Sequence, residues 1–124
     1  MNLNKELKLA YSYDIDVDAM YINVAKDYGY NQSIEFEFGI IMDFDTNGTP
    51  VALEIFDFSR LFGFDKYVLK NIKNIGMKIN VDCCISLDLE VGLQIENEMV
   101  QYDLKKIAAN YQKFPKMRYS YSIN

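Results

Sequence analysis

Oxygen-bearing side chains recur at alternate positions around one turn of the chain. The spacing of an EF-hand calcium loop is reproduced by five residues, namely Asp43, Asp45, Asn47, Gly48 and Glu54. Calcium requires oxygen ligands of this kind, but an EF-hand loop joins two helices, whereas the residues flanking this turn alternate as strands do. We therefore predict a hairpin turn, and keep weak calcium binding by Asp43, Asp45, Asn47 and Glu54 as an alternative hypothesis.

Other chemistry has little support in the residue types present. The chain contains no histidine, which excludes Ser–His and Cys–His nucleophile pairs and every metal site that needs an imidazole. No glycine-rich phosphate loop is present. The two cysteines, Cys83 and Cys84, are neighbours, so a disulfide between them would be strained and reduced thiols are expected. We predict that the protein is not an enzyme and has no cofactor apart from the hypothetical calcium ion.

The composition is that of one globular domain. Of the 124 residues, 50% are hydrophobic and 25% are charged, and the net charge is −5. This length suits a single domain, 1–124, with one core. The N-terminus has no apolar signal segment, and no stretch is long enough to span a membrane. Together with the reduced cysteines, these features predict a cytoplasmic protein that does not bind membranes.

Positive charge gathers at the C-terminal end. Asp103 is the last acidic residue, and the basic residues beyond it are Lys105, Lys106, Lys113, Lys116 and Arg118. The overall acidity argues against nucleic acid as a partner, because binding phosphates needs clustered Lys and Arg. A basic segment with several aromatic residues instead suits contact with an acidic protein surface. We therefore predict a protein partner or a homo-oligomer.

Alternation of apolar and polar residues predicts a β-meander in the first half. The segments that alternate are 8–13, 19–24, 34–44 and 51–55. In an up-and-down meander of four strands, the first and third connections lie at the same end of the sheet. The acidic connection 14–18 is therefore expected beside Asp45 and Asn47.

The register of the central hairpin can also be predicted. A two-residue Asn47–Gly48 turn would pair Phe44 with Val51 and Met42 with Leu53. Every inward residue then faces another inward residue. A loop of three residues would place Met42 opposite Ala52 and Ile40 opposite Glu54, so the two-residue turn is preferred.

The second half mixes helical and strand patterns. A helix in two pieces is predicted over 60–75, with Ser59 and Asp65 as caps and a break at Gly63. Residues 76–104 are predicted as a β-hairpin region, and 105–124 as a basic aromatic tail. Between residues 100 and 111, helical and strand spacing overlap, and both remain open.

The first half resembles a known family. The segments that carry the resemblance are Tyr13-Asp14, Asp18-Ala19-Met20-Tyr21-Ile22, Asp43-Phe44-Asp45, Gly48, Glu54-Ile55 and Asp57. They are similar to the bacterial and archaeal domain of unknown function 2283, over about residues 8–59, and the second half loosely resembles a longer archaeal variant. The chain departs from the pattern at Met20, where Leu is common, and at Ala52-Leu53, where Gly-Ile is common.

This resemblance implies a β-meander followed by a helix, and no established activity. Because some relatives are encoded beside small toxins, it also implies an antitoxin-like partner role as an alternative. The predicted fold class is α+β: an antiparallel β-meander of about four strands, one helix packed on it, then a β-hairpin and a basic C-terminal tail. The predicted function is a non-catalytic protein-interaction or self-association module. The alternatives are an antitoxin-like partner of a small toxin and a weak calcium-binding domain.

Overall fold

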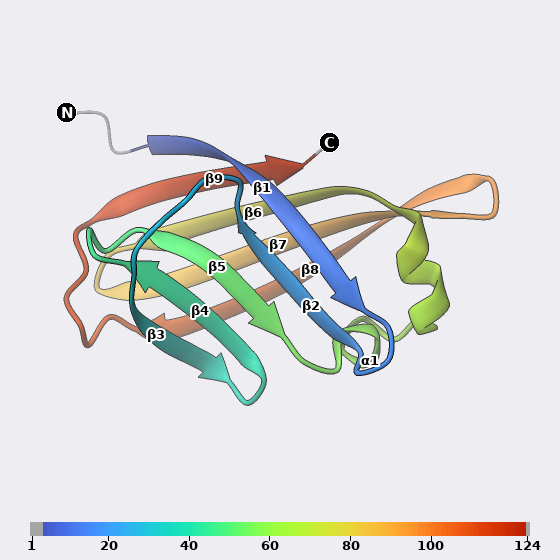
Figure 1. Cartoon of the computed structure of the whole chain (residues 1–124), viewed down its shortest axis with the longest axis horizontal. Coiled ribbons are helices and arrows are strands. Elements are labelled where there is room, and N and C mark those ends of the chain that lie inside the picture. Colours follow the sequence, from blue (N-terminus) through green and yellow to red (C-terminus); the bar gives the residue numbers. More distant parts are fainter. Residues whose placement is uncertain (1–3, 124) are drawn as a thin grey trace.

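The computed structural model describes residues 4–123, with side chains from residue 8 onward. Almost all of its elements are strands (Figure 1). In chain order they are β1 (Asn4–Asp14), β2 (Ala19–Val24), β3 (Tyr30–Glu37), β4 (Ile40–Asp45), β5 (Pro50–Ile55), α1 (Phe58–Phe62), the 3₁₀ turn η1 (Lys66–Asn71), β6 (Ile72–Val81), β7 (Cys84–Ile95), β8 (Glu98–Ala109) and β9 (Met117–Ile123). No described helix is long and apolar enough to cross a membrane.

The nine strands of the described residues belong to one mixed sheet, in the order β3-β4-β5-β2-β1-β9-β6-β7-β8. Neighbouring strands are antiparallel except β1 and β9, which run parallel. The sheet curls into a half-barrel, so that its two edge strands, β3 and β8, come into contact (Figure 1). The predicted α+β class is therefore wrong, because most of the described residues lie in strands of a single curled sheet.

The hydrophobic core lies inside the curl. Inward and outward residues alternate along the strands, as the pleat of a sheet requires, and β7 shows this over most of its length. The two halves of the sheet meet through large side chains. The ring of Phe44 stacks on that of Phe114 with centroids 4.0 Å apart. The Tyr121 hydroxyl donates a hydrogen bond of 2.5 Å to the Pro50 carbonyl, which ties β9 to the start of β5.

The predicted four-strand meander is wrong because the segment 34–44 is a hairpin. The chain reverses at Phe38–Gly39, where Gly39 has φ +85°. A β-bulge between Glu35 and Glu37 adds one residue to β3, and this restores the inward alternation on both sides of the turn. The apolar pattern therefore passes through the turn without a break, and periodicity alone could not reveal it.

The hairpin between β4 and β5 follows the predicted register in part. Met42 pairs with Leu53, as predicted, but Phe44 faces Pro50 instead of Val51 after a register shift. The turn is longer than the predicted two residues. The Asp45 N–H donates to the carbonyl of Thr49 at 2.9 Å, so three residues, 46–48, lie between this bonded pair.

The predicted helix over 60–75 is also wrong. Helical residues are confined to the five of α1 and the six of η1 among the described residues. Both lie at one end of the sheet (Figure 1). Ile72 and Ile75, which are spaced as on a helix, belong to β6, where Ile75 is buried.

The caps were predicted better than the helix itself. Gly63 ends α1 with φ 74°, and Asp65 caps η1 by accepting the Tyr67 N–H at 2.9 Å. The residue at the start of α1 is Asp57 rather than the predicted Ser59.

The predicted basic tail, 105–124, is not a tail. Its first five residues complete β8, which settles the open choice over 100–111 in favour of a strand. Residues 117–123 form β9, which lies in the middle of the sheet between β1 and β6, and Asn124 is outside the described residues. The predicted hairpin region 76–104 corresponds to most of β6, β7 and β8.

Candidate functional site

Strand β8 is one edge of the sheet. It forms a hairpin with β7, and the tip of this hairpin projects past the body of the molecule as an arm (Figure 1). From Val100 onward, half-buried and exposed residues alternate strictly along β8. The half-buried row faces the core, where Tyr102 packs against the rings of Phe62 and Phe64. The other row faces outward.

The direction of the backbone groups of β8 follows from one hydrogen bond. The Asn110 N–H donates to the Cys83 carbonyl at 3.2 Å, and this pair continues the ladder in which Cys84 faces Ala109. In an antiparallel ladder, hydrogen-bonded and non-hydrogen-bonded pairs alternate. The even-numbered residues of β8 therefore bond to β7, and the odd-numbered residues direct their N–H and C=O groups to the open edge. No strand in residues 4–123 pairs with that edge.

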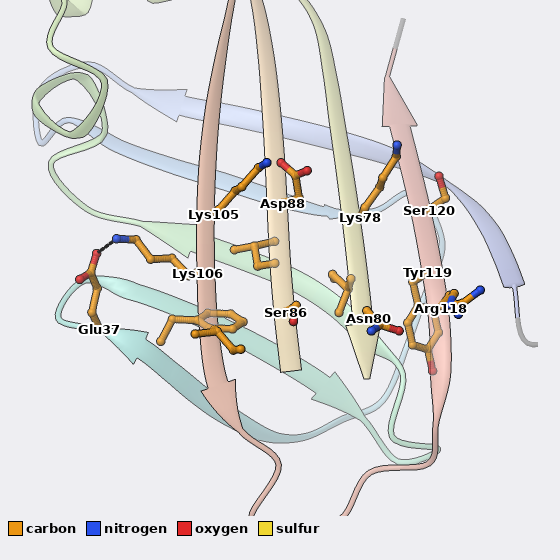
Figure 2. Close-up of a pocket in the computed structure, with 14 residues that line it drawn as sticks. Glu37, Lys78, Asn80, Ser86, Asp88, Lys105, Lys106, Arg118, Tyr119 and Ser120 are labelled. Atoms are coloured by element: carbon orange, nitrogen blue, oxygen red, sulfur yellow. Dashed lines mark ion pairs between the residues drawn. The ribbon is translucent and has the colours of Figure 1, made fainter. Parts of the chain in front are cut away.

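A groove of about 920 Å³ lies beside this edge, and its lining includes outward side chains of the sheet as well as Glu37 and Lys106, which meet between β3 and β8 (Figure 2). Residues directly opposite each other in a sheet share a face, so the register arranges the outward side chains of β9, β6, β7 and β8 in two rows. These rows are Ser120–Lys78–Asp88–Lys105 and Arg118–Asn80–Ser86–Ile107. The last members of both rows lie on β8, so the groove and the open edge form one surface.

The charges of this surface are unevenly compensated. Asp88 lies between Lys78 and Lys105 in the register, yet its buried Oδ1 has no hydrogen-bond partner among the described residues. Carboxylate oxygens of Asp88, Glu90 and Asp103 all lie within 4.8 Å of one another. Like charges at this spacing repel. The outward face near the β8 edge therefore carries a cluster of three acids, which we call the acidic trio.

The core side of β8 is closed by an ion pair. Lys106 Nζ lies 2.5 Å from Glu37 Oε1, at the end of β3 (Figure 2). This contact joins the two edge strands across the gap of the half-barrel. The neighbouring Lys105 points to the opposite face and makes no ion pair among the described residues.

The residues predicted to bind calcium lie on and beside the β4–β5 hairpin, but the structure gives several of their oxygens other partners. Asp45 Oδ1 accepts the backbone N–H of Asn47 at 2.8 Å. Asp43 Oδ1 accepts the Ser33 hydroxyl at 2.6 Å. In residues 4–123, the acidic trio is the one group of three or more such ligands close enough to share a metal ion, so Asp43, Asp45 and Glu54 do not converge. Calcium binding by these residues stays a prediction.

The acidic connection 14–18 does not lie beside Asp45, as was expected. Met20 pairs with Ile55 at the end of β5, whereas Asp45 precedes the start of β5. The two acidic turns are thus at opposite ends of the sheet. The reason is the extra hairpin at Phe38–Gly39, which reverses the chain once more than the meander assumed.

Several residues of the family-like pattern form a structural network. Asp18 has φ 53° and joins the β1–β2 turn to α1, because Ser59 donates both its N–H, at 3.0 Å, and its hydroxyl, at 2.8 Å, to the Asp18 carboxylate. The Tyr13 hydroxyl also donates to Asp18. Burial acts to raise the pKa of the Asp18 carboxyl, but the hydrogen bonds from Tyr13 and Ser59 outweigh it and hold that pKa below its ordinary value.

Residues 10–59 match the family model described as protein of unknown function (DUF2283). This match confirms the resemblance of the N-terminal half. The matched segment ends at Ser59, the residue that binds the Asp18 carboxylate, so the family pattern contains both ends of the structural network.

Two curated proteins are similar to this chain. A putative hypoxanthine phosphoribosyltransferase of Methanosarcina mazei is 29% identical over 112 residues, which are 90% of this chain and 89% of that protein. An uncharacterized protein of Methanocaldococcus jannaschii is 37% identical over 68 residues, which are 54% of this chain and 55% of that protein. No solved structure matches the chain.

Sequence reasoning missed the β8 edge, because it left residues 100–111 between strand and helix. A signal was present. In the segment Gln101-Tyr102-Asp103-Leu104-Lys105, an acid and a base stand on either side of one leucine, and every second residue is polar. Alternation of this kind favours a strand.

Proposed function

We propose that this protein is a non-catalytic interaction module that associates with itself through the open edge of β8. The observation that carries the proposal is the row of backbone N–H and C=O groups along this strand of 12 residues, with which no strand in residues 4–123 pairs. Such an edge is a template for pairing with another strand. Proteins that must stay monomeric often keep edge strands short or bulged, whereas the β7–β8 ladder runs its whole length without a register shift.

The outward row of β8 also presents apolar surface. The exposed fraction of Met99 is 52% and that of Ile107 is 64%. Charged residues, lysines above all, commonly protect an edge from pairing. Here Lys106 is engaged by Glu37 on the core side, so Lys105 is the lysine that remains in the outward row.

The basic residues of the segment 105–124 do not form a tail that could reach a partner. Lys116 lies 3.8 Å from Asp82 within the same chain, and Arg118 lies in the central strand β9. The proposal therefore rests on backbone groups at an edge, and not on a charged tail that reaches a partner.

The comparisons neither support nor exclude an enzyme. The matching family has no established function, and a transferase name on a relative 29% identical does not carry that activity to this chain. The antitoxin-like role stays a prediction.

The proposal is tested by blocking the edge without disturbing the β7–β8 ladder. The N–H of Gln101 points to the open edge, so Gln101→Pro removes an edge donor and adds bulk there while sparing every bond to β7. Gln101→Ala is the matched control, because it removes the same side chain and keeps the N–H.

Sedimentation across a range of concentrations should show association of the wild type and of Gln101→Ala, and a monomer for Gln101→Pro. Thermal melts at low concentration should show that all three proteins are folded. A wild-type protein that stays monomeric at millimolar concentration would overturn the proposal, as would a folded Gln101→Pro protein that associates like the wild type.

A further inference from the structure

The register of this association can be derived from the sequence of β8. We infer that two copies pair their β8 strands antiparallel, with Leu104 of each copy at the two-fold axis; this inference rests on the proposed self-association. Each copy then places Asp103 opposite Lys105 of the other copy. The two half-barrels become one continuous sheet across the seam.

Backbone geometry limits the registers that are possible. Only odd-numbered residues of β8 direct N–H and C=O groups to the open edge, so they must pair with odd-numbered residues of the second copy. In a two-fold arrangement the axis then passes through one residue of β8. Candidates near the middle of the strand are Tyr102, Asp103, Leu104 and Lys105.

Charge selects one of these four axes. An axis at Asp103 places that carboxylate opposite itself, and an axis at Lys105 does the same with two ammonium groups. Like charges directly opposite destabilise a sheet. An axis at Tyr102 places Asp103 opposite Gln101, which leaves its charge uncompensated. An axis at Leu104 forms two Asp103–Lys105 pairs, one on each side of the dyad.

The same register places a positive charge beside the negative charges of the acidic trio. Asp103 lies within 4.8 Å of two other carboxylates, Asp88 and Glu90, and it is the member on the edge strand. Lys105 of the second copy would face Asp103 directly and bring a cation to the cluster. Lys105 has no ion-pair partner among the described residues of its own chain. Each copy thus supplies the charge that the other lacks.

The remaining facing pairs are compatible with this register. On the core side, Leu104 meets Leu104 at the axis, and Tyr102 faces Lys106 of the second copy, whose charge is already compensated by Glu37 of its own chain. On the outward side, Gln101 faces Ile107, whose apolar side chain is largely exposed in the single chain.

Charge reversal tests the register. Asp103→Lys alone places two lysines opposite two lysines and should raise the dimer dissociation constant roughly tenfold or more, since two attractive pairs become repulsive. Lys105→Asp alone should raise the dissociation constant in the same way, because carboxylates at positions 103 and 105 then face each other. The double variant Asp103→Lys, Lys105→Asp restores opposite charges and should associate more tightly than either single variant. Lys26→Asp, an exposed charge reversal in the loop after β2, is the control and should leave association unchanged.

A disulfide provides a second test that does not depend on charge. At the axis, the two copies of residue 104 form a non-hydrogen-bonded pair with Cα atoms about 4.5 Å apart, which suits a disulfide. With Cys83 and Cys84 replaced by serine, Leu104→Cys should form a covalent dimer under mild oxidation, and Gln101→Cys should not.

The outcomes separate the register from the proposed function. A monomeric wild type would overturn both. The register alone would be overturned by a different set of results. In that case Gln101→Pro abolishes association, but the charge exchange does not restore it and Leu104→Cys does not crosslink the two copies.

Discussion

At the scale of single residues, the family-like motif is explained by structure rather than by chemistry. Asp18 is held in a left-handed conformation and accepts hydrogen bonds from Tyr13 and from Ser59, which lies 41 residues further along the chain. Hydrogen bonds donated to this half-buried carboxylate favour its charged form. The network fixes the β1–β2 turn against α1.

The depressed pKa of Asp18 makes its contribution to stability depend on pH. The folded protein binds the proton less tightly than the unfolded chain, so the stabilisation is complete above the unfolded pKa, near 3.8, and is lost as pH falls through the lower folded value. We expect Asp18→Asn to lower the free energy of unfolding at pH 7 and to have a smaller effect near pH 3.

Denaturant titrations at the two pH values measure this difference. Asp16→Asn, in the same turn but exposed, is the control and should show little effect at either pH. An equal loss for Asp18→Asn at pH 7 and pH 3 would show that the charge of this carboxylate does not stabilise the fold.

Gly48 is the residue on which the β4–β5 turn depends. Its φ is +76°, and a Cβ at this position would lie 3.2 Å from Pro115 Cδ and 3.3 Å from Phe114 Cδ1. We expect Gly48→Ala to cost about 2 kcal/mol of stability, from backbone strain and crowding together. Gly29→Ala is the control, because its Cβ would meet one atom at 3.9 Å. Equal melting temperatures for the two variants would contradict this role of Gly48.

At the scale of elements, β9 holds the two halves of the sheet together. It pairs with β1 on one side and β6 on the other, and it carries the buried Tyr121. We expect Tyr121→Ala to destabilise the fold by about 3 kcal/mol or more, because it leaves a large cavity in the core. Tyr111→Ala removes the same atoms from a side chain that is 87% exposed, and should cost little. Similar losses of unfolding free energy for Tyr121→Ala and Tyr111→Ala, measured by chemical denaturation, would show that β9 is not part of the cooperative core.

Local signals in the sequence predicted local features. The Met42–Leu53 pair, the Asp65 cap and the break at Gly63 each follow from residue types within a few positions of one another. The strand order does not follow in this way. The parallel pairing of β1 with β9 joins the two ends of the chain, and no periodic pattern indicates which distant strands will meet.

Two errors had a specific physical origin. The bulge next to Phe36 kept the apolar alternation in phase through a turn, so one hairpin was taken for a single strand. Ile72 and Ile75 fit a helical stripe as well as they fit a strand, so the start of β6 was assigned to a helix. The candidate site was missed because its basis is an unpaired edge, and edges exist only once the strand order is known.

At the scale of the whole molecule, the curl of the sheet distinguishes its two edges. The end of β3 contacts β8 through the Glu37–Lys106 ion pair, while the free edge of β8 borders the groove and pairs with no strand in residues 4–123 (Figures 1 and 2). A half-barrel that does not close retains backbone groups that need a partner. Pairing of two half-barrels through β8 would satisfy those groups without altering either core.

Amide hydrogen exchange along β8, followed by NMR at low and high protein concentration, tests this claim most directly. The N–H groups of Tyr102, Leu104 and Lys106 bond to β7 and should exchange slowly at both concentrations. Those of Asp103 and Lys105 face the open edge and should exchange fast in the dilute monomer but slowly in the concentrated protein. Fast exchange of these two amides at every concentration would contradict the assignment of the β8 edge as the contact.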